Sequence, residues 1–357
     1  MTDVQEVLRY TLYATLGIVT LLILLFLYLL VVKLYTLRQD ALQKRELEEI
    51  AAEGSAMDRY LVAGDISRRA VPRTELQYDI YERYLLHRQK LTRSQTEHGY
   101  ILEYAHTYLT ERLRRKLRSK KRSVRMNAMY SIVRFKMTEV APLLLELSEN
   151  KKLHEQEWFM ICRVIAAFQR EEAMAWLTDD RRELPVFVIR QMLLVLSESA
   201  LLHLAERYDS LPSRLQGHLL DVLRIRNART ESVLSLFERM LISEDGEQRI
   251  RALKGIANFG WMSDEALEAL AVRLDESSPA AWFERLMTIR LMGSLRDDRF
   301  LPYLEHWIGD SHYLVRIETA KSISRFKYGP ETLQRIAEQH PDRYAREMAV
   351  ERLVAME

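Results

Sequence analysis

The chain has 357 residues, of which 48% are hydrophobic and 11 are glycine, a composition typical of folded, mainly helical proteins. Its 53 Lys and Arg against 51 Asp and Glu give a formal net charge of +2, which excludes polyanion binding over the whole surface. The single cysteine, Cys162, excludes an intramolecular disulfide and fits a reducing compartment, and its apolar neighbours predict a small buried side chain.

Residues 10–32 form an apolar run without a charged side chain, between Arg9 and Lys33. At the helical rise, this run spans roughly 35 Å, enough to cross a hydrocarbon core of about 30 Å. It predicts one transmembrane helix, which satisfies its backbone polar groups within the segment. A buried core helix and a cleaved signal peptide are the alternatives, but residues 1–7 are acidic and no small-residue cleavage site follows the run.

The flanks of the run predict its orientation. Residues 1–9 carry one basic residue, whereas Lys33, Arg38, Lys44 and Arg45 follow the run within about 15 residues, the range over which the positive-inside bias acts. Residues 1–9 are therefore predicted to be extracytoplasmic, and the body that follows Lys33 to be cytoplasmic.

Residues 33–72 predict a charged juxtamembrane helix and a linker, with a break near Gly54, Gly64 and Pro72. Residues 73–119 predict two amphipathic helices, near 74–91 and 100–117, that cap the next domain. Their tyrosines recur every three or four residues and so share a helical face. Core packing is the favoured interpretation of that face, and an aromatic binding surface is the alternative.

Residues 120–357 contain a repeat. A basic residue is followed by a small residue three positions later, an aliphatic residue four after that, and a bulky apolar residue three further on. We number the last residue position 12, which makes the others positions 2, 5 and 9. Three copies end at Phe135, Phe259 and Phe326, weaker copies end at Phe168, Leu196, Ile225 and Leu295, and the intervals are 33, 28, 29, 34, 36 and 31 residues. A period of about 32 predicts stacked helix pairs, because one pair cannot bury its apolar face alone.

The copies in SVRMNAMYSIVRF, EQRIRALKGIANF and YLVRIETAKSISRF resemble the HEAT-repeat family, over roughly residues 120–357. The resemblance implies an all-α chain in which the transmembrane helix precedes a right-handed α-solenoid. It also implies that the second helix of each pair lines the concave side. An N-terminal anchor followed by such repeats is similar to bacterial proteins that accompany membrane glycosyltransferases in envelope polysaccharide systems. That likeness implies a single-pass protein of the cell inner (cytoplasmic) membrane.

Catalytic constellations are not found in the sequence. It contains no G-x-x-x-x-G-K-[ST], G-x-S-x-G or H-E-x-x-H motif, and its nine histidines are scattered. We therefore expect neither an enzyme nor a metal or other cofactor. Asp179-Asp180 and Asp297-Asp298 are interpreted as helix caps. An enzyme of the HEAT-type DNA glycosylase or lyase kind is the alternative, and would require the five tryptophans at 158, 176, 261, 282 and 307 to converge.

Two charge features suggest binding surfaces. The first is a basic patch within residues 111–125, for which anionic lipid, an acidic partner and a solvated helix end are alternatives, and nucleic acid is unlikely. The patch comprises Arg112, Arg114, Arg115, Lys116, Arg118, Lys120, Lys121 and Arg122.

The second feature is the exposed face predicted at positions 7 and 11. Seven of these fourteen residues are basic and none is acidic, although position 11 lies near a helix C-terminus, where the dipole itself favours cations. A basic groove that receives an acidic segment of a membrane-associated protein is therefore predicted, in a scaffold or adaptor. The fourteen are Tyr130, Arg134, Arg163, Ala167, Gln191, Val195, Leu220, Arg224, Lys254, Asn258, Arg290, Ser294, Lys321 and Arg325.

Overall fold

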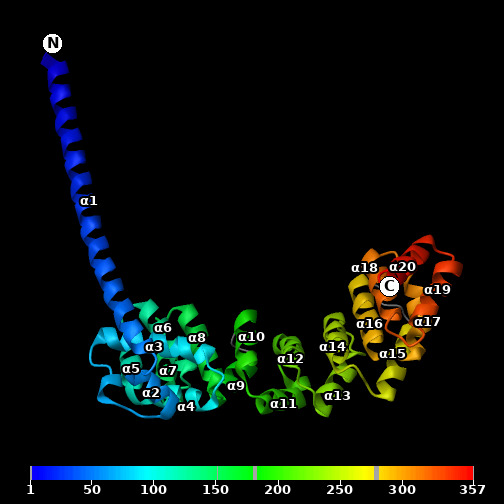
Figure 1. The fold of residues 1–357 in the computed structure, drawn as a ribbon. Helices are drawn as coiled ribbons and strands as arrows, with labels where there is room; N and C mark the ends of the chain where they lie inside the picture. Colours follow the sequence, from blue (N-terminus) through cyan, green and yellow to red (C-terminus); the bar gives the residue numbers. More distant parts are fainter. Residues whose placement is uncertain (1, 151, 180–182, 277–280, 357) are drawn as a thin grey trace. The chain divides into compact units, whose positions relative to one another are not determined.

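The computed structural model describes residues 2–150, 152–179, 183–276 and 281–356, and within these ranges the regular elements are all helices (Figure 1). The chain forms two compact units, Met1–Leu153 and His154–Glu357, called unit 1 and unit 2. The first repeat, which ends at Phe135, belongs to unit 1, and the other repeats belong to unit 2.

Unit 1 begins with one long helix. The predicted membrane run and the juxtamembrane helix are a single helix, α1, and the predicted break follows it at Gly54, whose φ of 71° suits glycine. The predicted helix at 100–117 is in fact two helices that meet at Leu109. The helices are α1 (Thr2–Ala51), α2 (Ala56–Ala63), α3 (Glu75–Leu91), α4 (Gln95–Tyr108), α5 (Thr110–Leu117), α6 (Arg122–Arg134) and α7 (Ala141–Ser148).

The tyrosines of unit 1 pack in its core. Tyr81, Tyr84 and Tyr104 are buried, and the Tyr104 ring lies near those of Tyr60 and Tyr81. The hydroxyls of Tyr81 and Tyr104 donate hydrogen bonds to the carbonyls of Arg69 and Ala70, so burial leaves neither unsatisfied. Core packing, the favoured prediction for this helical face, is confirmed.

Unit 2 consists of alternating helices. Even-numbered helices carry the sequence repeat, as does α6 in unit 1, and we call them the repeat helices. The helices of unit 2 are α8 (Glu155–Ala167), α9 (Glu171–Thr178), α10 (Val186–Val195), α11 (Glu198–Glu206), α12 (Ser213–Ile225), α13 (Glu231–Met240), α14 (Gly246–Phe259), α15 (Asp264–Glu276), α16 (Trp282–Leu295), α17 (Leu301–Trp307), α18 (Tyr313–Ile323), α19 (Gly329–Gln339) and α20 (Arg343–Val354).

The repeat helices of unit 2 stack in chain order. Each contacts the next, from α8 through α20, and α11 contacts α13 in the second row (Figure 1). Position 9 supplies the core of this stack, because its side chains have no exposed surface in α8 through α18. This arrangement confirms the predicted helix-pair repeat. The buried position 9 residues are Ile165, Leu193, Ile256, Met292 and Ile323, with Leu223 in α12, where the copy ends one residue later than predicted.

The arginine at position 2 has the same contacts in three repeats, and Arg346 of α20 has them as well, in a truncated further copy of the repeat with Ala349 and Leu353. The Nη1 atoms of Arg125, Arg249, Arg316 and Arg346 each donate to the backbone carbonyls six and five residues earlier, at 2.6 to 3.1 Å. These carbonyls belong to the turn that precedes each repeat helix, where no intrahelical partner exists. The repeated arginine is thus explained as a cap for the turn.

We expect Arg249→Met to lower the free energy of unfolding by about 3–5 kcal/mol, because it leaves Glu284 buried without its partner. Arg249 Nε lies 2.6 Å from Glu284 Oε1, and both side chains are largely buried. Urea unfolding of the full chain in detergent, followed by circular dichroism, measures the change.

The double variant Arg249→Met, Glu284→Leu is the control, and we expect it to cost clearly less than the sum of the two single changes. Additive costs would contradict a coupled buried pair.

Candidate functional site

The predicted groove residues of unit 2 lie mostly at the surface of the repeat helices. Lys254, Arg290, Lys321 and Arg325 are exposed, and Arg163 is half-buried. Arg134 is also exposed, and it belongs to α6 of unit 1.

The structure corrects the repeat that was assigned to end at Ile225. Asn227 has a positive φ of 53°, and the residues just after Phe135 and Phe168 are also positive, with 53° at Lys136 and 56° at Gln169. Arg226 and not Ile225 is therefore the residue at position 12. The hydrogen bonds agree, since the amide of Arg226 donates to the carbonyl four residues earlier, as do those of Phe135 and Phe168.

This shift changes the residues on the face. Leu220, predicted to face outwards, is fully buried, and Arg224 is half-buried at position 10. Asp221 takes position 7 instead, and Ile225 takes position 11. The prediction that no acid lies on this face is therefore wrong. The corrected position 2 is Gln216, whose Nε2 donates to the carbonyls of Tyr208 and Leu211, so it replaces the arginine as a cap for the turn.

Two ion pairs join neighbouring repeat helices across the face. Asp221 Oδ2 of α12 lies 3.3 Å from Arg251 Nε of α14, and Arg290 Nε of α16 lies 3.3 Å from Glu318 Oε1 of α18. In both pairs the residue at position 7 of one repeat contacts the residue at position 4 of the next. Position 7 is the acid in the first pair and the base in the second. The charges of Asp221 and Arg290 are thus neutralised by partners within the protein. The basic character of the face is concentrated at Lys254, Lys321 and Arg325.

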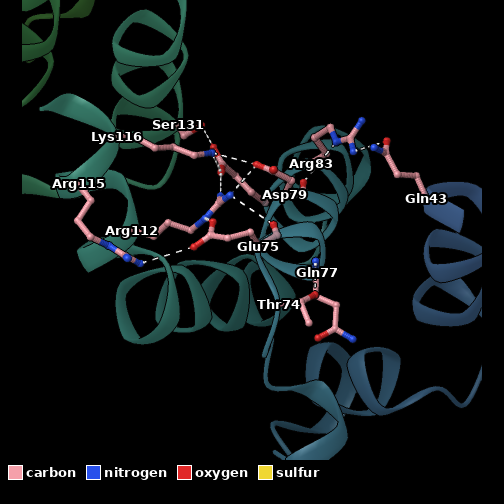
Figure 2. Close-up of polar contacts among 11 residues, drawn as sticks. Gln43, Thr74, Glu75, Gln77, Asp79, Arg83, Arg112, Arg115, Lys116 and Ser131 are labelled. Carbon is pink, nitrogen blue, oxygen red and sulfur yellow. Dashed lines mark hydrogen bonds and ion pairs between the residues drawn. The ribbon is translucent and has the colours of Figure 1, made fainter. Parts of the chain in front are cut away.

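The predicted basic patch is not a solvated surface throughout. Figure 2 shows Arg112 of α5 beside two acids of α3, with its Nε 2.9 Å from Glu75 and its Nη2 2.8 Å from Asp79. Its Nη1 also lies 3.1 Å from a third acid of α3, Glu82. Lys116 contacts Asp79 at 3.1 Å and Glu82 at 2.8 Å. We call these five residues the Arg112 cluster.

The Arg112 cluster is buried on one side. Arg112 and Glu82 are buried, and Ser131 of α6 donates a hydrogen bond to Glu82 Oε1 at 2.5 Å. The cluster therefore ties α3, α5 and α6 together, and Arg112 and Lys116 are not available to an anionic ligand. The acids at 75, 79 and 82 share one helical face by their spacing, a signal in the sequence that the prediction of a basic patch did not use.

The charges of the cluster depend on one another. Burial alone would raise the pKa of Asp79, but hydrogen bonds from Arg112 and Lys116 outweigh it and lower that pKa below its usual range. Burial alone would lower the pKa of Arg112, yet the hydrogen bonds that it donates to Asp79 and Glu75 raise that pKa.

The rest of the predicted patch is more accessible. Arg115, Arg118, Lys120 and Lys121 are exposed, and the last three lie in the turn between α5 and α6, whereas Arg114 and Arg122 are half-buried. Arg115 has a long contact of 3.9 Å with Glu75. A basic surface therefore remains, but it consists mainly of the three cations in the turn between α5 and α6, and not of all eight residues of the predicted patch.

Helix α1 is long and apolar enough to cross a membrane. An 18-residue stretch within Thr15–Ala51 has a mean hydropathy of 2.9, and none of it is buried inside the protein. Further along α1, between its residues 40–47 and residues 80–87 of α3, lies a cleft of about 400 Å³. Its apolar lining includes Leu47, Ile80 and Tyr84, and Arg83 bridges it by donating to Gln43 Oε1 at 2.9 Å (Figure 2).

Chemical sites are not evident among the described residues. They hold no group of three or more His, Cys, Asp and Glu that could bind a metal ion, and Cys162 is fully buried, as predicted. Among the tryptophans, Trp158 lies near Trp176, Trp307 is buried, and Trp282 stacks on His312.

The aspartate pairs have mixed outcomes. Asp297 accepts a hydrogen bond from the Arg299 amide and caps the short helix Asp298–Phe300, as predicted. Asp179 was predicted to cap the N-terminus of a helix, but it lies at the C-terminal end of α9 instead. Asp180 lies outside the described residues.

The stacked helix pairs of unit 2 define it as an α-solenoid. No protein-family model matches the chain, and no curated protein matches it. Among solved structures, the chain is similar to one described as the Pds5–Scc1 complex with implications for cohesin function, at 14% identity and a TM-score of 0.30. The match covers 87% of this chain and 59% of that chain, so this chain spans about three fifths of its length. At those values the likeness defines neither a family nor a function.

We expect Arg112→Met to lower the free energy of unfolding by about 3 kcal/mol, the low end for breaking a buried pair, because Lys116 still neutralises Glu82. Lys120→Met should change it by less than about 0.5 kcal/mol. Urea unfolding midpoints of the full chain in detergent test this difference.

Acidification is a second measurement for the same variant. A lowered pKa of Asp79 stabilises the fold above the ordinary aspartate pKa of about 3.9, and this contribution is lost as the pH falls through the lower folded value. The difference between the native chain and Arg112→Met should therefore narrow below about pH 4. A constant difference would mean that the arginine acts by packing alone.

Proposed function

We propose that the protein is a single-pass, membrane-anchored scaffold or adaptor whose HEAT-like solenoid binds a protein partner. Residues 10–32 lie in the cell inner membrane, and the rest of the chain is cytoplasmic. The partner is a membrane protein, such as a glycosyltransferase or another envelope-assembly enzyme. The action is stoichiometric and not enzymatic.

The observation that carries this proposal is the exposed apolar part of α1. Its large side chains from Ile18 to Val32 are 40 to 66% exposed within the protein, and none of its most apolar stretch is buried against another element. A bilayer provides that contact and confines the solenoid to two dimensions. Confinement raises the effective concentration of the solenoid towards any partner in the same membrane.

The face of the repeat helices supports the second half of the proposal. Lys254 on α14, Lys321 in the last turn of α18 and Arg325 just after that helix are exposed, beside a face on which neighbouring repeat helices form ion pairs. Cations on a rigid helical surface suit an acidic segment of a partner, because charge complementarity speeds association and fixes register.

The topology is tested by thiol labelling in a Cys162→Ala background. With a membrane-impermeant maleimide on intact spheroplasts, we expect Thr2→Cys to be labelled and Lys120→Cys to be labelled only after lysis. The chain without either introduced cysteine, in the same background, is the unlabelled control, and Cys162→Ala removes a side chain that is fully buried in the native protein. The reverse pattern, or recovery of the chain in the soluble fraction, would exclude the proposed anchor.

The partner-binding face is tested by charge reversal. Changing Lys254, Lys321 and Arg325 to glutamate should reduce the partner recovered by crosslinking and affinity capture from native membranes at least tenfold, because an acidic segment is then repelled. The full-length chain is used throughout, and the partner should be recovered at near-equal stoichiometry.

A matched control reverses three exposed cations of unit 1, at Arg118, Lys120 and Lys121. We expect this control to retain the partner. If it loses the partner while the first variant retains it, the turn between α5 and α6 is the binding surface instead.

A further inference from the structure

The first turns of α16, α18 and α20 carry a row of exposed apolar side chains. Trp282 is 38% exposed, Phe283 45%, Tyr313 51%, Leu314 47% and Tyr344 59%, and we call these five residues the aromatic edge. The three helices are consecutive repeat helices in contact with one another. Apolar side chains gathered on neighbouring elements mark interaction surfaces more often than singly scattered ones do.

Stacking holds the rings of the aromatic edge in place. The rings of Trp282 and His312 are parallel, with centroids 4.0 Å apart and planes at 3°. The Arg316 guanidinium lies 5.7 Å from the centroid of Tyr313 and 5.1 Å from that of Tyr344, and so joins α18 to α20. Rings ordered in advance lose little entropy on binding, and Trp, Tyr and Arg are the residues that dominate binding energy at interfaces.

The charges beside the aromatic edge favour a mildly acidic ligand. Arg285 pairs with Asp310 and Arg343 pairs with Glu347. Arg316 is different, because its Nη1 bonds backbone carbonyls, which carry no net charge.

Arg346 makes the same kind of contacts. The positive charge of these two arginines is partly offset by Asp342, which caps α20 by accepting a hydrogen bond from the Tyr344 amide. This small positive excess complements a few carboxylates, and it is too small for the dense phosphate charge of a nucleic acid.

The spacing of the helices suits an extended chain. Packed helices lie about 8–10 Å apart, so the rings of successive repeats recur at about that distance. A polyproline II segment has three residues per turn and advances about 9 Å per turn, so every third side chain returns to the same side. Such a segment presents one side chain to each of α16, α18 and α20.

We propose that the aromatic edge binds an extended segment of a partner protein that carries proline or another apolar residue at every third position, with carboxylates between. Prolines pack on the exposed rings, and the carboxylates lie near Arg316 and Arg346. This surface is separate from the cations at positions 7 and 11, and gives the solenoid a second specificity.

Fluorescence anisotropy with the full-length protein in detergent tests this proposal. The probe is a labelled twelve-residue peptide that repeats Pro-Glu-Ala. We expect it to bind at least tenfold more tightly than a peptide that repeats Pro-Glu-Ala-Ala, which breaks the spacing, and than one that repeats Pro-Lys-Ala, which reverses the charge. The variant Tyr313→Ala, Tyr344→Ala should reduce the affinity at least tenfold.

Tyr328→Ala is the matched control, because Tyr328 is 53% exposed and also lies beside a cation, Lys327, but is not on the aromatic edge. It should bind the peptide as the native chain does. The charge-reversed variant of Lys254, Lys321 and Arg325 should also keep peptide binding, which separates this surface from the proposed groove. Equal affinity for the three peptides, no binding, or tighter binding of a twelve-nucleotide single strand would overturn the proposal.

Discussion

The burial of position 9 between neighbouring repeat helices is the interaction on which unit 2 depends. Ile165, Ile256 and Ile323 illustrate it, since each is fully buried and belongs to a helix that contacts the next repeat helix. A helix pair with such an apolar face cannot be stable alone, so the repeats stack. Stacking brings turns close together, and their carbonyls need donors. The arginine at position 2, or Gln216 in its place, supplies them.

The same stacking decides which charges remain for a ligand. Position 7 of one helix faces position 4 of the next, and where these residues have opposite signs they pair. Asp221 with Arg251 and Arg290 with Glu318 follow this rule. Such half-exposed pairs contribute little to stability, on the order of 1 kcal/mol or less. Their main effect is on the surface, because they remove two charges from the face that a partner would contact.

The periodicity of the sequence predicted the helix pairs and the long N-terminal helix, because both depend on patterns of apolar residues over many positions. The end of α12 could not be placed in the same way. Ile225 and Arg226 are adjacent, and at position 12 of the repeat an aliphatic residue fits the sequence pattern better than an arginine. Backbone hydrogen bonds and the positive φ of Asn227 nevertheless identify Arg226 as position 12. Arg112 was assigned to an accessible basic patch because the acids that pair with it, Glu75, Asp79 and Glu82, lie 30 to 37 residues earlier in the chain. Only the folded structure brings them next to it.

The continuity of α1 bears on the choice between an adaptor and a lipid sensor. In the proposed topology, Gln43 lies ten residues beyond Lys33, about 15 Å from the end of the apolar run at the helical rise. Its contact with Arg83 fixes α3 at that depth. Lipid headgroups extend only about 5–8 Å beyond the hydrocarbon core, so the α1–α3 contact lies below them. A partner that meets α3 must therefore reach into the cytoplasm, which suits a membrane protein with a cytoplasmic segment better than a lipid.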